Sequence, residues 1–231
     1  MSKYKHLFFD LDHTLWDYDA NAAAALTDLH VKYDLHQKSG FTADELISNF
    51  FLVNYALWDD FNVGAIGKED IRKHRFPRIY DALGVSHDHI PFNMELEYVD
   101  LCPRKKATMP MAHEVLDFLK EKFEIHIITN GFKEIQTRKM ASALLSPFFT
   151  EVITSESAGY RKPDPRVFEY ALGKAGASKQ ESIMIGDNLI ADIGGARNAG
   201  IDQAFYNPDR KTHQEEVTYE IQSLGQLMEL L

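Results

Sequence analysis

Two aspartates follow an apolar run near the N-terminus, in the stretch FFDLDHTL. Side chains alternate along a strand, so Asp10 and Asp12 would project to one side of it and Leu11 to the other. Carboxylates this close repel each other unless a cation, a proton or an anionic substrate with its own metal is present. The pair predicts an acidic site, although two solvated aspartates in a surface turn would have the same sequence.

Two further stretches carry groups that suit a phosphate. The stretch IITNG presents the hydroxyl of Thr129, and the turn at Asn130 and Gly131 could expose backbone N–H groups to phosphate oxygens. The stretch GYRKPDP brings Lys162 to the end of another apolar run, where it could neutralise a phosphoryl group or Asp10. Taken singly, a turn capped by Thr129 and a solvent-exposed basic turn are the alternatives.

A fourth stretch, IMIGDNLIADIGG, contains two more aspartates, Asp187 and Asp192, five residues apart. Oxygen ligands at this spacing suit Mg²⁺, with Asp187 as a direct ligand and Asp192 holding a metal-bound water. The alternative is a helix whose first turn carries acidic residues that interact favourably with its dipole.

The elements that must position these groups alternate between strands and helices. Strand-like apolar runs are YKHLFFD, FEIHIITN, EVITS, ESIMIGD and QAFYN, and the later ones are separated by segments with helical spacing. Two of those segments end in Gly176 and Gly200, which are suitable helix stops. The pattern predicts an α/β fold with a doubly wound, Rossmann-like parallel sheet, and the four polar groups would follow four successive strands.

One long segment breaks this alternation. From about residue 17 to residue 103 the patterns are helical, and no run reads as a strand. We therefore predict an α/β core domain formed by residues 1–16 and 104–231, with an inserted all-helical cap domain at 17–103. An insert that leaves after the first strand should sit over that strand's carboxyl end, where open α/β sheets bind ligands.

The four polar groups together resemble the haloacid dehalogenase superfamily. Its phosphatases carry an Asp-x-Asp-x-Thr motif, a Ser or Thr, a Lys and a Gly-Asp-x-x-x-x-Asp motif in that order, matched here by residues 10–14, Thr129, Lys162 and residues 186–192. The resemblance runs from about residue 4 to the C-terminus and includes the helical cap. His13 departs from the glycine expected at its position in many members.

The resemblance implies a role for each residue. Asp10 would attack phosphorus and form an aspartyl-phosphate, while Asp12 would act as general acid and base. Thr129 and nearby backbone N–H groups would bind phosphoryl oxygens, with Lys162 bridging Asp10 and the transferred group. The cofactor would be Mg²⁺, bound by the Asp10 side chain, the Asp12 carbonyl oxygen, Asp187 and, through water, Asp192.

The run LWDDFNVGAIGKEDIRKHRF in the helical segment resembles a narrower group, the pyrimidine 5′-nucleotidases. The prediction is a magnesium-dependent phosphatase of small phosphate monoesters, above all pyrimidine nucleoside 5′-monophosphates. A sugar-phosphate phosphatase and a phosphoglucomutase-like phosphomutase are the main alternatives. A 2-haloacid dehalogenase and a non-catalytic binding module are weaker ones, because a dehalogenase needs no acid at Asp12 and a binding module needs no intact set of reactive groups.

The amino-acid composition restricts the classes of molecule that the protein is expected to bind. The 231 residues carry a formal net charge of −10, which would repel a nucleic-acid polymer, so the expected partner is a small phosphorylated metabolite such as a nucleotide. No run is apolar for long enough to span a membrane, no signal peptide begins the chain, and the single cysteine, Cys102, suits a reducing compartment. We expect a cytoplasmic protein, as a monomer or small homo-oligomer.

Overall fold

The computed structural model describes residues 2–231, which divide into two compact units. The α/β unit contains residues 2–18 and 106–231, and the helical unit contains Asp19–Lys105. The role of the helical unit as a cap domain remains a prediction, and so do the domain boundaries at residues 17 and 103.

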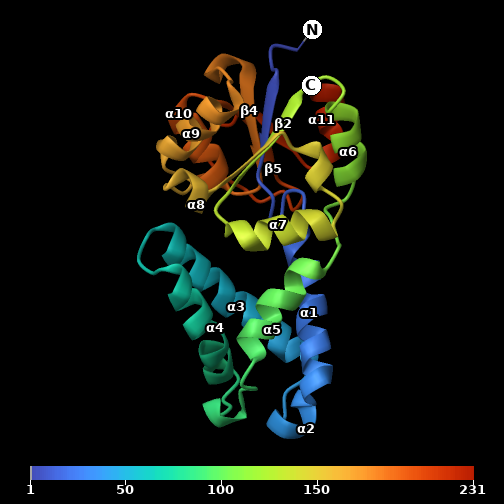
Figure 1. Ribbon diagram of the computed structural model, residues 1–231, viewed down its shortest axis with the longest axis vertical. Helices are drawn as coiled ribbons and strands as arrows, with labels where there is room; N and C mark the ends of the chain where they lie inside the picture. The colour runs from blue at the N-terminus through green and yellow to red at the C-terminus, as the bar shows by residue number, and fades with distance from the viewer. Residues whose placement is uncertain (1) are drawn as a thin grey trace. The chain divides into compact units, whose positions relative to one another are not determined.

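The α/β unit is built on a six-stranded sheet (Figure 1). Every neighbouring pair of strands is parallel, in the order β3-β2-β1-β4-β5-β6, so the predicted doubly wound α/β fold is confirmed. Five of the strands were predicted, whereas the short sixth one, at the sheet edge, was not. The strands are β1 (His6–Phe9), β2 (Glu124–Thr129), β3 (Glu151–Thr154), β4 (Ser182–Gly186), β5 (Asp202–Tyr206) and β6 (Tyr219–Ile221).

Helices lie on both sides of this sheet (Figure 1). On one side, α9 (Pro165–Ala175) and α10 (Gly195–Ala199) cover an apolar core in which Phe8, Met184 and Phe168 are fully buried. On the other side lie α6 (Ala112–Leu119) and α11 (Leu227–Leu230). The helices α7 (Lys133–Ser142) and α8 (Ser155–Ala158) follow β2 and β3.

Both predicted helix stops are present. Gly176 and Gly200 have φ of 62° and 77°, the left-handed backbone that glycine adopts without a steric penalty. The helix predicted after β4 differs in its first part, because Leu189–Gly194 forms a π-helical turn before α10 begins. Short 3-10 segments cover His87–His89, Cys102–Arg104, Ser146–Phe148, Lys179–Glu181 and Leu224–Gln226.

The helical unit contains no strand among residues 19–105, as its sequence predicts. Its second long helix begins with a capping box in which Thr42 and Glu45 satisfy each other's backbone N–H groups. The buried rings of Phe50, Phe76 and Tyr80 form much of its core. Its helices are α1 (Tyr18–Tyr33), α2 (Leu35–Ser39), α3 (Ala43–Asn62), α4 (Lys68–Ala82) and α5 (Met94–Leu101).

Within residues 2–231, no helix combines the length and the apolar character needed to cross a lipid bilayer.

Candidate active site

Three neighbouring strands end within two residues of one another at the same edge of the sheet. The register pairs Phe9 at the end of β1 with Ile127 of β2 and with Ile185 of β4. The next residue, Asp10, donates its backbone N–H to the carbonyl oxygen of Ile185 at 2.9 Å. Parallel strands therefore carry Asp10, Thr129 and the loop that begins at residue 187 to one edge of the sheet, where α/β folds bind ligands.

A buried lysine organises this edge. The Nζ atom of Lys162 donates hydrogen bonds to Asp10 Oδ1 at 2.5 Å, to Asp192 Oδ1 at 2.6 Å and to the carbonyl oxygen of Ile128 at 2.7 Å. All three of its protons are thus in use, and its side chain is 3% exposed. The Asn130 side chain fixes the Lys162 backbone, donating to its carbonyl and accepting from its N–H.

Burial and neighbouring charges shift the pKa values of Lys162, Asp10 and Asp192 in opposite directions. Burial lowers the pKa of Lys162, but the carboxylates of Asp10 and Asp192 outweigh it and leave that pKa above its ordinary value. Burial also raises the pKa of Asp10 to about 7, since the attraction of Lys162 offsets only part of the cost of a buried charge. The pKa of Asp192 is raised for the same reason.

Asp187 brings a third carboxylate to the same place. The hydroxyl of Thr14 donates to its Oδ1 at 3.0 Å, and burial followed by the charge of Asp10 raises the pKa of Asp187 to about 6. One carboxylate oxygen from each of Asp10, Asp187 and Asp192 falls within 4.8 Å of the others. An excess of buried negative charge carried entirely by oxygen donors fits a hard divalent cation such as Mg²⁺.

Asp192 is already well supported by the chain. Its Oδ1 accepts from Lys162, and its Oδ2 accepts the backbone N–H of Asn188 at 3.0 Å. The Asn188 side chain in turn caps the π-helical turn by accepting from the N–H groups of Ile190 and Ala191. This arrangement suits a residue that orients ligands, while Asp187, with one partner hydroxyl, is the better placed of the two for a direct bond to a cation.

Asp12 belongs to a second, adjoining network. Its carboxylate accepts from Lys139 Nζ at 2.6 Å and from Gln136 Nε2 at 2.9 Å. Burial acts to raise the pKa of Asp12, but the charge and hydrogen bond of Lys139 and the hydrogen bond of Gln136 outweigh it, and the pKa lies below the ordinary value. The neighbouring aspartates thus have separate cations, Lys162 for Asp10 and Lys139 for Asp12.

Thr129 is buried, and both acceptor positions of its hydroxyl oxygen are in use. Its Oγ1 accepts from Gln136 Nε2 at 2.7 Å and from the Gly131 N–H at 3.1 Å. The Gly131 N–H, one of the backbone groups predicted to bind phosphate, therefore forms a hydrogen bond within the chain, and the Asn130 side chain binds the Lys162 backbone. The Gly131 N–H could donate to a phosphate only by exchanging its partner, whereas the Thr129 hydroxyl could donate its own proton.

The sequence-based reasoning missed Gln136 and Lys139. Both lie on α7, three residues apart and so on one helix face, which presents an amide and an ammonium to Asp12. The Lys139 ammonium also lies 4.5 Å from the ring centroid of Trp16 and 5.3 Å from that of Tyr18. The sequence did contain a signal for these residues. The helix that follows the TNG turn carries two polar residues three positions apart, on one of its faces.

Three positions show how tightly the strand ends are packed. A Cβ atom added at Gly186 would overlap the carboxyl group of Asp192, and one added at Gly131 would overlap the amide of Gln136. His13 has a φ of 62°, in the left-handed region that favours glycine. That backbone explains why glycine suits this position, and the His13 ring lies 5.2 Å from the ring of Tyr18.

Comparisons with known proteins show which family the chain resembles over its length. The family model of the haloacid dehalogenase-like hydrolases matches residues 4–200. The pyrimidine 5′-nucleotidase PynA of Streptococcus pneumoniae is 36% identical over 99% of this chain and 95% of its own. The pyrimidine 5′-nucleotidase YjjG of Escherichia coli is 29% identical over 99% and 98%.

A solved structure is similar over nearly the whole chain. The putative HAD-hydrolase YfnB of Bacillus subtilis, determined with bound magnesium, superposes with a TM-score of 0.87. It is 29% identical in sequence, with 99% of both chains covered.

Proposed function

The chain belongs to the haloacid dehalogenase-like hydrolases, as its motifs predict, and we propose that within this family it is a magnesium-dependent pyrimidine nucleoside 5′-monophosphate phosphatase. The observation that carries the proposal is the buried cluster in which Lys162 Nζ lies 2.5 Å from Asp10 beside Asp187 and Asp192. A buried cation facing several carboxylates suits the transfer of an anionic phosphoryl group, whose charge must be neutralised as it reacts.

Asp10 is the proposed nucleophile. One of its oxygens would attack phosphorus and displace the nucleoside oxygen, forming an aspartyl-phosphate that water then hydrolyses. Lys162 holds this carboxylate in one orientation and places a positive charge beside it. Asp10, Asp187, the Asp12 carbonyl oxygen and, through a water, Asp192 would hold Mg²⁺, which would neutralise charge on the phosphoryl oxygens.

Asp12 is the proposed acid and base. Its lowered pKa favours the carboxylate, which is the form that accepts a proton from the attacking water. Donating a proton to the leaving oxygen requires the acid form, and an anionic phosphate arriving beside Asp12 would raise its pKa in that direction. Lys139 and Gln136 would hold the carboxylate in place throughout.

The substrate class is supported by the two nucleotidase relatives and by one helix of the helical unit. Most aromatic rings of that unit are buried, but Phe51, Tyr55 and Trp58 are partly exposed. They stand at positions i, i+4 and i+7 of α3, which places them on one face of the helix. A planar aromatic face of this kind can stack on a nucleobase.

A substrate panel tests the proposal. Phosphate release from uridine, thymidine and adenosine monophosphates and from small sugar phosphates should be measured with Mg²⁺. We expect kcat/KM for uridine or thymidine monophosphate to exceed that for adenosine monophosphate by about tenfold or more, equivalent to about 1.4 kcal/mol. Faster hydrolysis of sugar phosphates than of every pyrimidine nucleotide would reject the nucleotidase assignment and leave a phosphatase of another substrate class.

Two sets of variants make the panel specific. The Asp10→Asn protein, purified in the same way, must lose the activity, which excludes a contaminating phosphatase. Trp58→Ala and Tyr55→Ala should reduce the preference for pyrimidines, while Phe92→Ala, which removes a fully exposed ring elsewhere in the helical unit, should leave it unchanged. If the preference survives both α3 substitutions, the assignment of that helix face is wrong.

A further inference from the structure

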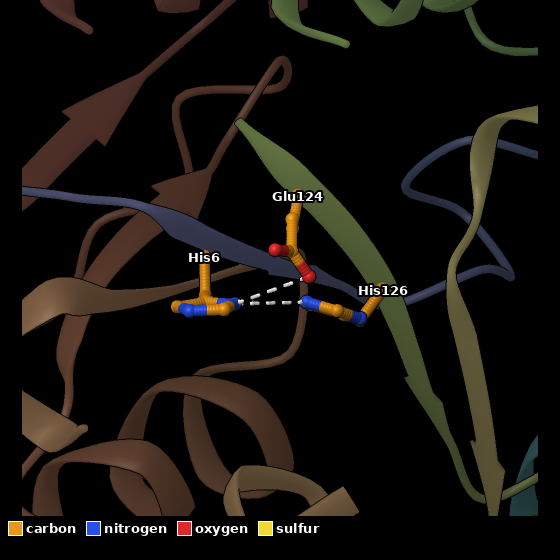
Figure 2. A group of neighbouring side chains, drawn as sticks. All are labelled: His6, Glu124 and His126. Carbon is orange, nitrogen blue, oxygen red and sulfur yellow. Dashed lines mark hydrogen bonds and ion pairs between the residues drawn. The ribbon is translucent and has the colours of Figure 1, made fainter. Parts of the chain in front are cut away.

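A second cluster of metal-binding side chains lies at the other end of strands β1 and β2. His6 is the first residue of β1, while Glu124 and His126 are the first and third residues of β2 (Figure 2). The parallel register pairs His6 with Glu124 and Phe8 with His126. Side chains two residues apart on a strand project from the same face, so this register gathers all three groups at one place.

The donor atoms are spaced as ligands of one ion would be. His6 Nδ1 lies 3.2 Å from His126 Nε2 and 3.9 Å from Glu124 Oε2 (Figure 2). Two Zn–N bonds of about 2.0 Å that meet at a tetrahedral angle hold their nitrogens about 3.3 Å apart. One donor atom from each of the three residues falls within 4.8 Å of the others.

Packing alone does not account for the histidines. His6 is 8% exposed and His126 is fully buried, within apolar strands. In the absence of an ion, one ring nitrogen must donate to the other. His126 Nδ1 then has no hydrogen-bond partner within residues 2–231, and a buried polar atom in that condition costs free energy. An ion bound to Nε2 would not give Nδ1 a partner, but the free energy of metal binding would add to the stability of the fold and so offset this cost.

Glu124 adds charge to the cluster and leaves it open to solvent. Its carboxylate places a negative charge beside the two imidazoles, and its 59% exposed side chain gives an ion access from solvent.

We propose that His6, Glu124 and His126 bind a divalent transition-metal ion that prefers nitrogen ligands, represented by Zn²⁺. Imidazole suits such ions, whereas Mg²⁺ prefers oxygen, so donor atoms would direct different metals to the two clusters. Asp10 follows His6 by four positions along the chain of β1, about 13 Å at about 3.3 Å per residue, which is too far for a shared ion. The bound ion would join β1 to β2 and stabilise the α/β unit.

Equilibrium dialysis tests the site. The full chain, without a histidine tag, is dialysed against increasing Zn²⁺ in excess Mg²⁺, and bound zinc is counted by mass spectrometry. We expect one high-affinity zinc per chain and a higher melting temperature with Zn²⁺ present. Zinc K-edge X-ray absorption should report two imidazole ligands. Absence of saturable binding would overturn the proposal.

Variants separate this site from the aspartate cluster. His6→Gln and Glu124→Gln should each weaken zinc binding, the first by at least about 100-fold, because losing a direct ligand costs no less than losing an outer partner. Glu124 is exposed, so its variant tests the site even if a change at His6 impairs folding. Asp187→Ala, and His87→Gln in an exposed pair with Asp81, should retain the zinc. Unchanged affinity in both ligand variants would reject the assignment.

Discussion

Each unit buries a cation against carboxylates, but the two charge balances differ. In the α/β unit one lysine, Lys162, faces three carboxylates that lie close together. In the helical unit Glu95 accepts a hydrogen bond from Arg75 at 3.1 Å and is also within the influence of the Arg72 charge, and the Arg75 guanidinium lies 5.1 Å from the ring centroid of Tyr98. An excess of carboxylates leaves room for a further cation and for an anionic substrate, whereas a carboxylate balanced by arginine beside aromatic rings serves packing.

The largest effect should come from the nucleophile. Asp10→Asn keeps the volume and a hydrogen-bond acceptor for Lys162 but cannot form the covalent intermediate, so kcat should fall by about 10⁴-fold or more. Steady-state phosphate release and capture of labelled phospho-enzyme measure it. Asp209→Asn, at an exposed aspartate, is the matched control. Retained turnover in pure Asp10→Asn protein would contradict the role given to the cluster.

Removal of metal should have the next largest effect. Chelation with EDTA should lower activity by roughly 10³-fold, Mg²⁺ should restore it, and Ca²⁺, with its looser coordination, should not. Asp187→Ala should raise the Mg²⁺ concentration for half-maximal activity more than Asp192→Ala does. Full activity in metal-free buffer would mean that the excess of carboxylates has another purpose.

Breaking the pair in the helical unit should change stability instead of chemistry. Arg75→Met leaves Glu95 partly buried without its hydrogen-bonded cation, and we expect a loss of about 2 kcal/mol in the free energy of unfolding, since Glu95 retains the charge of Arg72 and some contact with water. Urea unfolding followed by circular dichroism measures it. The controls are Arg104→Met, in an exposed pair with Asp100, and the kcat of the folded protein.

A substitution of Lys139 tests whether this residue of the α/β unit contributes to catalysis or only to packing. Lys139→Met removes the charge beside Asp12 and keeps most of the side-chain volume, so kcat should fall by about tenfold while KM changes little. Lys133→Met, at an exposed lysine on the same helix, should have no effect. Equal losses from both variants would assign the effect to general electrostatics of α7.

The smallest expected effect is a pH dependence. Burial raises the pKa of Glu95, although Arg75 opposes it, so the folded chain holds this proton more tightly than the unfolded chain does. The contribution of Glu95 to stability is therefore fully present below about pH 4.3 and declines as the pH rises through the folded pKa. As the pH rises over that window, the unfolding free energy of the wild type should fall relative to that of Glu95→Gln, whose side chain does not ionise. A difference independent of pH would show that Glu95 titrates as in the unfolded chain.

Strand periodicity and motif order were sufficient to predict the parallel sheet, the helical segment and the family. Buried parallel strands such as β4 leave a strong local signal, whereas β6 has three residues at a sheet edge and leaves little. The strand ends carried Asp10, Thr129 and Asp187, so these groups could be placed at one edge from topology alone.

Partnerships that depend on tertiary packing could not be predicted in this way. The contact of Lys139 with Asp12 joins residues far apart in the chain and depends on the rotation of α7 about its axis. The histidine cluster leaves still less signal, because His6 and His126 each stand alone within an apolar strand. Only the register between β1 and β2 brings them together.

The glycines at the strand ends set a requirement for anyone who transfers this site to another scaffold. Asp192 and Gln136 occupy the space in which a side chain on residue 186 or 131 would lie. A design that reproduces every charged group, but places alanine at those two positions, would push the carboxylate and the amide away from their partners. A design of this site must therefore leave the space beside the backbone of residues 186 and 131 open for the side chains of Asp192 and Gln136.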